Sequence, residues 1–466
     1  MLIAMPNRRQ LFTVLAFVVT FLMTLALLQH THSIPAIKEA LRPKPKPDPE
    51  PPASTHHPKH KQPPKYTPPP IKDNFPLLAT STSPPPIPSW NIPRPNLHKE
   101  HNLPVPPPLL IGFTRTWPLL QQSVVSYITA GWPADQIYII ENTGVQMANA
   151  RGQLTLQNPF FLNHTVLRTL GVNIIQTPTL LNFAQLQNFY LSLSYAHDWP
   201  YYFWSHMDVL ALSYEDGLDG VTPRYDEPGY KALYELAVTA LAEARRSDPR
   251  WGLRFFAYDH LALVNPVAYE DVGGWDTLIP YYITDCDMHS RLTMRNWSLK
   301  DAKAGIITDV SVALDDLGAL YRAEGVVPRF TDPNPPEEGA PSRRTRRNVN
   351  NNTPSSQLSA REPGITPRDG TAEHDLGKWR ALLHTADGMF HYKVSNKGGR
   401  NTWQTGQRGG YWEPYHYDAA GFQEALEIIT EAGKEVYRHK WGHRDCDLIE
   451  GGGLTFEDQW GVERDW

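Results

Sequence analysis

Carboxylates at two places in the sequence have the spacing that sugar transfer needs. The apolar run Tyr201–Ser205 ends in His206-Met207-Asp208, and a later Gly-Gly-aromatic-Asp turn at Gly273–Asp276 leads into Asp285 and Asp287. A carboxylate at the end of a strand can hold a divalent cation that binds a diphosphate. A second carboxylate can accept the proton of an incoming hydroxyl. Together the two places predict the transfer of a sugar from a nucleotide donor to a hydroxyl acceptor.

The segments around these residues alternate between strand and helix signals. LLIGF at Leu109–Phe113 and QIYII at Gln136–Ile140 predict short buried strands, and Pro118–Ala130 between them has helical spacing with a proline in its first turn. The sequence also predicts a strand at Val172–Gln176, a helix at about Phe183–Ala196 and the strand Tyr201–Ser205. Because strands that alternate with helices form right-handed crossovers, the expected fold is α/β, a mostly parallel sheet with helices on both faces.

Ligands bind such sheets beyond the carboxyl ends of the strands. Thr114-Arg115, Glu141 and His206–Asp208 all follow predicted strands and fall at this edge. The net charge of -5 gives the chain no broad attraction to nucleic acid. The expected ligand is therefore a nucleotide-sugar, and no nucleic-acid partner is predicted.

Four motifs, in this order, carry a resemblance to a known family: Glu141-Asn142-Thr143-Gly144, Ala184–Asn188, Gly273–Asp276, and Thr284–Met288 with Arg291 after it. Through them, residues 108–325 resemble the GT-A nucleotide-sugar glycosyltransferases, above all the large inverting family that includes chitin and cellulose synthases. The chain also looks like a fungal group of type II membrane glycosyltransferases. The resemblance implies a GT-A (Rossmann-like) fold and inversion at the transferred sugar.

The resemblance also implies which residues meet the donor. In the family, the second strand ends in a carboxylate that contacts the base or the ribose, and this role falls to Glu141. Thr114 and Arg115 lie at the end of the first strand, and Asn188 lies in the helix that precedes the metal strand. These four residues form the predicted donor side.

The acceptor side follows from the later motifs. The resemblance implies that Asp285 is the catalytic base, and Asp287 stays open as the alternative. Trp275 offers a ring face to a sugar, Asp276 belongs to the same turn, and Arg291 can orient the acidic pair. We therefore assign Trp275, Asp276 and Arg291 to the acceptor.

The metal motif departs from the family pattern, because His206-Met207-Asp208 stands where Asp-x-Asp is usual. An imidazole nitrogen suits magnesium poorly but is accepted by manganese. The sequence thus predicts a divalent cation on His206 and Asp208, manganese with magnesium as the alternative. The third ligand is left open among His384, His391 and His443.

The N-terminus predicts a membrane anchor. Leu11–Leu28 carries no charge and would span about 27 Å as a helix. Arg8-Arg9 precede it and the first lysine after it is Lys38, so the positive-inside rule places the rest of the chain in the lumen. The expected location is the Golgi or endoplasmic reticulum membrane as a single-pass type II protein, with a cleaved signal peptide as the alternative. Luminal sequons would be Asn163, Asn296 and Asn351.

Composition divides the chain further. Many of its 44 prolines fall before residue 108, and such a sequence forms neither helix nor sheet interior. The predicted segments are a cytosolic tail at 1–10, the anchor at 11–28, a Pro-rich stem at 29–107, a catalytic domain at 108–329, a disordered insertion at 330–373 and a C-terminal part of the catalytic region at 374–466. The last of these is expected to close over the acceptor side.

Two function classes remain beside the enzyme. The predicted function is metal-dependent transfer of a sugar to a glycan or glycoprotein, whereas an inactive GT-A domain that binds carbohydrate or acts as a luminal scaffold is the alternative. A secreted hydrolase is the third class. The two cysteines, Cys286 and Cys446, exclude a disulfide scaffold and a four-thiolate zinc site. They form either one disulfide or two free thiols.

Overall fold

The computed structural model describes residues 19–23, 58–60, 70–79, 81–331, 370–395, 407, 409–411, 413 and 418–464. The chain divides into two compact units, Met1–Thr67 and Pro68–Trp466. In the first unit residues 19–23 are helical, while the rest of the predicted anchor and the predicted cytosolic tail lie outside the described residues. No helix in the described part of the chain is long and apolar enough to cross a membrane.

The second unit is built on a seven-stranded sheet with the order β3-β2-β1-β4-β7-β6-β8. The strands are β1 (Leu109–Phe113), β2 (Ile137–Glu141), β3 (Asn173–Gln176), β4 (Tyr202–Ser205), β6 (Trp251–Phe255), β7 (Leu261–Val264) and β8 (Ser298–Asp301). β7 runs antiparallel to its neighbours β4 and β6, and the other strand pairs are parallel. The predicted mostly parallel sheet is confirmed.

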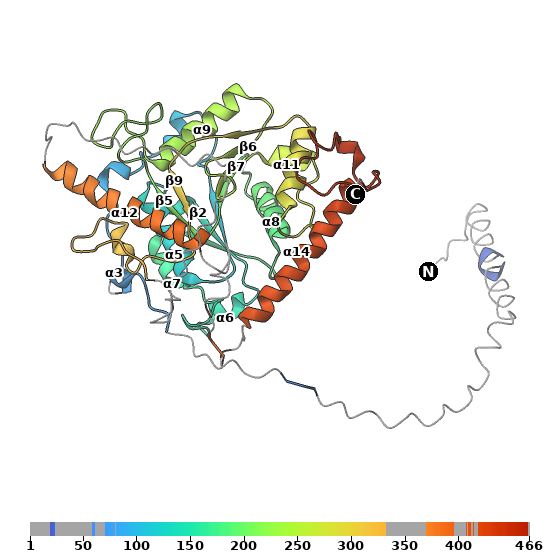
Figure 1. Ribbon diagram of the computed structural model, residues 1–466, viewed down its shortest axis with the longest axis horizontal. Coiled ribbons are helices and arrows are strands. Elements are labelled where there is room, and N and C mark those ends of the chain that lie inside the picture. The colour runs from blue at the N-terminus through green and yellow to red at the C-terminus, as the bar shows by residue number, and fades with distance from the viewer. Residues whose placement is uncertain are drawn as a thin grey trace, which may run out of the picture. The chain divides into compact units, whose positions relative to one another are not determined.

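Helices cover both faces of this sheet, as predicted (Figure 1). The alternation of side chains in β4 shows why: Phe203 joins one apolar core, and Tyr202 and Trp204 join the other. The first core contains α5 (Trp117–Thr129), α7 (His164–Leu170) and α9 (Leu233–Ser247), and the second contains α8 (Phe183–Ala196), α10 (Pro266–Asp271) and α11 (Thr284–Met294). The predicted helix at 183–196 has these bounds in the structure.

A small second sheet follows the strand that carries the predicted metal motif. β5 (Val209–Leu212) starts directly after Asp208 and pairs antiparallel with β9 (Ile306–Asp309). In this register Val209 lies opposite Asp309, and the Val310 amide donates to the Asp208 carbonyl at 2.9 Å. Two carboxylates that are far apart in the sequence are thereby brought to one end of the same sheet.

The predicted stem ends earlier than expected. Residues 29–57 and 61–69 lie outside the described residues, but the chain from residue 81 to 107 packs on the domain instead of standing away from it. Phe75, Leu97 and Leu103 are buried in the first core, and Asn91 donates to the Thr129 carbonyl at 2.9 Å. Apolar side chains between the prolines thus fix this segment to the surface.

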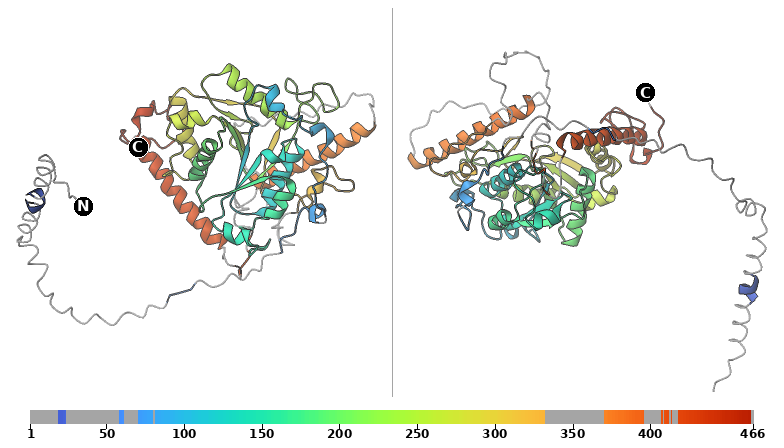
Figure 2. Two further views of the ribbon diagram at one scale, coloured as in Figure 1. Left: turned by 180° about the vertical axis from the view of Figure 1, so that it is seen from behind. Right: turned by 90° about the horizontal axis from the view of Figure 1, so that it is seen from below.

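Two long helices complete the domain. α12 (Gly370–Ser395) packs against β9, and α14 (Ala419–Trp441) packs against α11 (Figure 1). Seen from below in Figure 2, both helices lie on the same side of the domain. Residues 332–369 of the predicted insertion lie outside the described residues, and α12 begins at Gly370. The short elements are α3 (Pro76–Ala79), η1 (Ser89–Asn91), α4 (Leu97–Glu100), η2 (Ala134–Gln136), α6 (Gln146–Ala150), η3 (Leu317–Ala319) and η4 (Phe456–Asp458).

Candidate active site

A cavity of about 550 Å³ lies at the carboxyl ends of β1, β2 and β4, the edge at which the sequence predicts ligand binding. Its size is that of a small-molecule site. The predicted site residues that line it are Thr114, Arg115, His206, Asp208, Trp275 and Asp285. One cavity therefore joins two of the four predicted donor residues, Thr114 and Arg115, to one of the two predicted catalytic carboxylates.

One face of α14 forms the far wall of this cavity. The lining residues of the helix are Phe422, Gln423, Leu426, Glu427, Thr430, Glu431 and Lys434, a spacing of three and four that marks a single helical face. Residues near the end of the helix fix it to the domain, because Lys440 Nζ lies 2.7 Å from Asp276 Oδ2 and 2.8 Å from Asp287 Oδ1. The C-terminal region thus covers the site, as expected from the sequence.

Asp285 and Asp287 have different surroundings. Asp285 is half-buried, lines the cavity and accepts a hydrogen bond of 2.6 Å from the Tyr258 hydroxyl. Asp287 is fully buried outside the cavity, where Arg291 lies 2.7 Å from Oδ2 and the Trp441 indole donates to Oδ1 at 3.0 Å. Of the two, Asp285 is the carboxylate that a ligand can reach.

Three of the predicted binding residues shape the site from outside the cavity lining. Arg291 donates to the carbonyls of Val272 and Gly274 at 2.6 and 2.8 Å, and Asn188 exchanges two hydrogen bonds of 2.8 Å with the backbone of Trp275. A Cβ on Gly274, whose φ is +72°, would lie 2.8 Å from Asn188 Oδ1, which explains the glycine there. Asn188, Asp276 and Arg291 therefore hold the Trp275 turn in place.

Glu141 also lies outside the cavity lining. Its carboxylate is fully buried and accepts hydrogen bonds from Asn149 at 2.9 Å and Gln176 at 2.8 Å, and His164 Nε2 lies 2.9 Å away. The next residue, Asn142, lines the cavity and fixes the backbone of Leu181 at its rim through two hydrogen bonds of 2.7 and 2.8 Å. The end of β2 therefore meets the cavity through Asn142.

Three residues next to the cavity have a strained backbone. Thr116, Tyr258 and Ile283 have φ values of 72°, 47° and 74°, a left-handed conformation that is unfavourable for residues other than glycine. Thr116 follows Arg115 and opens α5, Tyr258 donates to Asp285, and Ile283 opens α11. Each of these residues turns the chain where a cavity side chain must be placed.

The cavity wall combines aromatic rings with polar atoms that the protein leaves without partners. Phe183 packs edge-on against Trp275 and Trp204, with ring centroids 5.4 and 6.0 Å apart. Among the described residues, the buried lining atoms that have no hydrogen-bond partner include Trp204 Nε1, Trp275 Nε1, Thr284 Oγ1 and Gln187 Oε1. The rings of Phe183, Trp204 and Trp275 therefore give this wall an aromatic character, whereas the unpartnered polar atoms lie behind its surface.

The predicted metal ligands meet a lysine that sequence reasoning missed. Lys393 of α12 places Nζ 2.7 Å from Asp208 Oδ2 and 2.6 Å from Asp309 Oδ1, and all three side chains are nearly fully buried. Burial opposes ionisation of Asp208, yet Lys393 and His206 hold the pKa of its carboxyl well below the usual range. The carboxylate predicted to bind a divalent cation is thus paired with an ammonium group.

His206 stands beside this pair. Its Nδ1 lies 3.7 Å from Asp208 Oδ1, and its Nε2 lies 3.7 Å from Asp259 Oδ2. Although burial opposes protonation of the ring, the surrounding carboxylates of Asp208, Asp259 and Asp309 raise the pKa of His206. The other histidines considered as ligands on α12, His384 and His391, are exposed.

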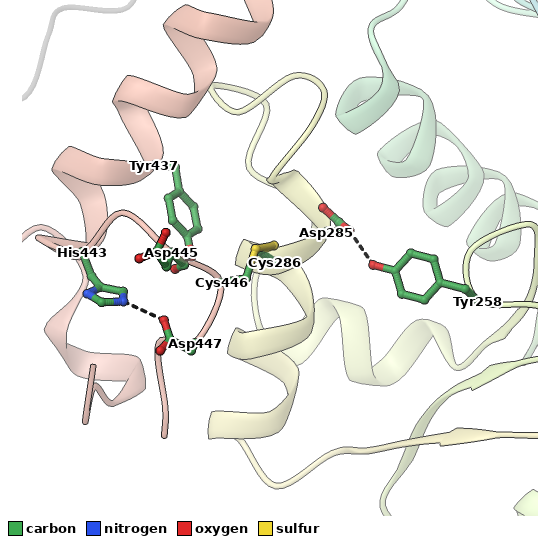
Figure 3. The surroundings of a disulfide bond; sticks show 8 residues. All are labelled: Tyr258, Asp285, Cys286, Tyr437, His443, Asp445, Cys446 and Asp447. Atoms are coloured by element: carbon green, nitrogen blue, oxygen red, sulfur yellow. Dashed lines mark hydrogen bonds and ion pairs between the residues drawn. A yellow bond between two sulfur atoms is a disulfide. The ribbon is translucent and has the colours of Figure 1, made fainter. Parts of the chain in front are cut away.

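Cys286 and Cys446 form a disulfide that joins α11 to the segment after α14. Figure 3 shows Asp285 and Tyr258 on one side of this bond and His443, Asp445 and Asp447 on the other. The ligand atoms of these last three residues lie within 4.8 Å of one another, an arrangement that could hold a metal ion. Asp445 and Asp447 are exposed, and none of the three lines the cavity.

Comparison with known proteins finds no matching family model and no matching curated protein. Among solved structures, the chain matches the mannosyltransferase PcManGT from Pyrobaculum calidifontis, in complex with GDP-Man and Mn2+, at 12% identity and a TM-score of 0.27, over 42% of this chain and 55% of that one. It also matches a cytidylyltransferase from Leptospira borgpetersenii serovar Hardjo-bovis (strain JB197) at 8% identity and a TM-score of 0.26, over 43% of this chain and 76% of that one. The chain thus spans about half the length of the mannosyltransferase, and at these scores both resemblances are distant.

Proposed function

We propose that this protein transfers a sugar from a nucleotide-sugar donor to a hydroxyl group of a glycan or glycoprotein acceptor. The observation that carries the proposal is the single cavity that contains the ends of β1 and β4 together with Asp285. A donor and an acceptor bound there would meet next to a carboxylate that can accept a proton.

The β1 side of the cavity suits the donor diphosphate. Thr114 and Arg115 line the cavity just before α5, a helix of 13 residues whose N-terminus favours an anion. The Arg115 guanidinium lies 4.5 Å from the centre of the Phe422 ring of α14, so the two walls meet at this point. The nucleoside would then lie toward Asn142, Leu180 and Leu181 at the end of β2.

Asp285 would act as the general base. Its carboxylate accepts the proton of the acceptor hydroxyl, while the hydroxyl oxygen attacks the anomeric carbon and the bond from that carbon to the diphosphate breaks. The nucleoside diphosphate leaves on the opposite face, so the configuration of the sugar inverts. The Tyr258 hydroxyl, 2.6 Å from Asp285, orients the carboxylate.

The cation predicted at His206 and Asp208 does not fit the residues as they lie. Oδ2 of Asp208 already accepts from Lys393 at 2.7 Å, and Asp309 shares the same ammonium group. No step of the proposed reaction therefore involves a metal. An inactive domain that binds carbohydrate is the second candidate, favoured by the aromatic wall, which would hold a sugar whether or not transfer occurs.

The test is Asp285→Asn. A thermal-shift screen of nucleotide-sugars first identifies the donor, and the release of nucleoside diphosphate then measures turnover. Asp285→Asn should keep donor binding and lower turnover by about a hundredfold, the usual scale of general base catalysis. The exposed Asp219→Asn serves as the matched control and should be fully active. Full activity of Asp285→Asn would show that Asp285 is not the general base. Donor binding without any turnover by the wild type would favour the inactive carbohydrate-binding domain.

We further propose that this reaction takes place in the lumen of the Golgi or endoplasmic reticulum, with the chain held by the predicted anchor at 11–28. The disulfide between Cys286 and Cys446 supports an oxidising compartment, since disulfides are rare in the cytosol.

A further inference from the structure

The ammonium group of Lys393 lies at the site but has no role in the proposed reaction. Its three N–H donors all have acceptors, namely Asp208 Oδ2 at 2.7 Å, Asp309 Oδ1 at 2.6 Å and the Val310 carbonyl at 3.2 Å. The side chain is 3% exposed. An ammonium group with three short contacts is fully satisfied, so Lys393 is held firmly at this point.

The position of Lys393 follows from the buried face of α12. Trp379, Leu382, Ala386 and Met389 are buried on this helix and recur at helical spacing, and Lys393 continues the same stripe by one turn. The Trp379 indole also donates to the Ser213 carbonyl at 3.1 Å. The packing of the helix therefore delivers Lys393 to the carboxylates, as a core side chain and not as a surface group that happens to swing inward.

The charges around Lys393 require a cation at this place. Asp208 and Asp309 share one end of the β5–β9 sheet, and neither carboxylate can be buried unpaired without a large cost. A divalent cation on Asp208 Oδ2 would take the position that Lys393 Nζ holds. The other oxygen, Oδ1, faces His206, but a cation there would add a second positive charge to a carboxylate that is already neutralised.

We infer that Lys393 replaces the divalent cation at this site, so that a nucleoside diphosphate binds the cavity without metal. The inference rests on the proposed function, because it assigns the diphosphate to the cavity bordered by Asp208. With the two carboxylates balanced by Lys393, the cationic groups that face the cavity, Arg115 and Lys434, would meet the diphosphate directly.

The inference makes two claims that can be measured separately, metal binding and nucleotide binding. The probe for the first is Mn2+ alone, titrated into the full-length protein by calorimetry and compared between the wild type and Asp208→Asn, which cancels binding at any other place on the chain. The two proteins should give the same isotherm. Lys393→Met frees Asp208, Asp309 and His206 and should gain a Mn2+ site that is lost again in Lys393→Met/Asp208→Asn. Lys393→Arg keeps the positive charge and should gain none.

The second measurement is the affinity for UDP and GDP in EDTA and in Mn2+. The wild type and Lys393→Arg should bind the preferred nucleotide within about twofold in the two buffers, whereas Lys393→Met should need Mn2+ and bind about tenfold more weakly in EDTA.

The outcomes separate this inference from the proposed function. A Mn2+ site in the wild type that Asp208→Asn removes would overturn the inference, and so would a nucleotide affinity that rises about tenfold with Mn2+ in the wild type. Neither result requires Lys393→Met to fold. If neither nucleotide binds under any condition, the proposed donor site fails, while the Mn2+ titrations still decide whether Lys393 holds the position of a metal.

Discussion

Two carboxylates in the first turn of α11, those of Asp285 and Asp287, have different surroundings and different roles. Asp285 and Asp287 are two positions apart, so their side chains point to opposite sides of the helix. Asp285 reaches the cavity, whereas Asp287 meets Arg291 and Lys440 in the interior. One carboxylate can serve chemistry while the other holds α11, the Trp275 turn and α14 together.

A substitution of Asp287 should therefore affect stability before it affects chemistry. Asp287→Asn removes the charge from a buried ion pair and leaves Arg291 and Lys440 underneutralised, which typically costs about 3 kcal/mol or more. Urea denaturation of the wild type, Asp287→Asn and the exposed Asp445→Asn as control would measure the loss. Unchanged stability in Asp287→Asn, together with a turnover as low as that of Asp285→Asn, would transfer the base role to Asp287.

The Lys393 ion pair predicts opposite pH dependences for two proteins. In the wild type the pKa of Asp208 is lowered, so its contribution to stability is present above the ordinary value of 3.8 and is lost as the pH falls below it. Lys393→Met removes the ammonium group and leaves His206 as the cationic neighbour of Asp208, which should raise the pKa of Asp208, so this variant should gain stability as the pH is lowered from 7 to about 5. Denaturation curves at several pH values would measure both slopes. Parallel slopes in the two proteins would show that Lys393 does not balance these carboxylates.

The sequence predicts much of this site because its signals are local. Strand ends, the Gly273-Gly274 turn and the acidic start of α11 lie in short segments, and six of the predicted residues line one cavity. Lys393 lies 185 residues from Asp208, beyond a Pro-rich and polar segment, and no local pattern marks it as an ion-pair partner. The sequence leaves the third metal ligand open among His384, His391 and His443, whereas the face of α12 that packs inward ends in Lys393.

At the scale of elements, α14 forms one wall of the cavity without belonging to the sheet. Its inner face presents Thr430, which is 8% exposed, while Ile428 on the outer face is 63% exposed. A larger side chain on this face of α14 can therefore reduce the cavity volume without a change to Asp285 or Arg115.

Filling the cavity from this helix should block a ligand. Thr430→Trp adds a large ring to the lining and should raise the Michaelis constant for donor or acceptor by about tenfold or more, since it removes space that the ligand needs. Ile428→Trp puts the same ring on the outer face and is the matched control. Steady-state kinetics of both variants, with melting temperatures to show that they fold, would make the comparison. Equal effects of the two changes would mean that this face of α14 does not meet the ligand.

The disulfide cross-links α11 to the segment that follows α14. It closes a loop of 160 residues, and a bond across a loop of that order contributes about 5 kcal/mol in the chain-entropy model. Cys446→Ser should lower the midpoint of denaturation and weaken ligand binding, because the segment after α14 is then held only by non-covalent contacts, such as the packing of Leu448 in the Ile279–Trp441 cluster and of Phe456 against Arg295. Dithiothreitol should reproduce the effect in the wild type and leave Cys446→Ser unchanged. An equal response of both proteins to the reductant would argue against the bond.

Elements follow from the sequence where periodicity is strong. The helix at 183–196 and the strand at 109–113 match the predicted bounds, because the first has apolar residues at helical spacing and the second is a short continuous apolar run. The reversal of β7 and the pairing of β5 with β9 are long-range choices that no local period records. The packing of residues 81–107 was missed for a similar reason, since a few apolar side chains such as Leu97 outweigh the prolines around them.

At the scale of the whole molecule, the disulfide and the glycosylation sequons both bear on the cellular compartment of the protein. The disulfide requires an oxidising environment, and the sequons at Asn163, Asn296 and Asn351 suit a luminal chain. Asn351 lies outside the described residues. Asn163 is half-buried and caps α7 by accepting from the Val166 amide at 3.0 Å, whereas Asn296 is exposed in the turn between α11 and β8. Among the described sequons, Asn296 is therefore the best placed to carry a glycan.

If the domain faces the lumen, Asn296 should be glycosylated. The full-length chain expressed in a eukaryotic cell should lose mass on treatment with an N-glycosidase, and Asn296→Gln should lose that part of the shift. Because Asn296 has a φ of 60°, a left-handed conformation that glutamine adopts less readily than asparagine, this variant should also melt at a slightly lower temperature. Asn163→Gln is the contrasting variant: it removes the N-cap of α7 and should cost about 1 kcal/mol whether or not a glycan is present. A chain recovered from the membrane fraction with no glycan on any sequon would contradict the proposed topology. A glycosylated chain released into the medium with a new N-terminus directly after the apolar run at 11–28 would keep the luminal placement and replace the anchor with the cleaved signal peptide, whereas cleavage farther into the stem would leave the anchor in place.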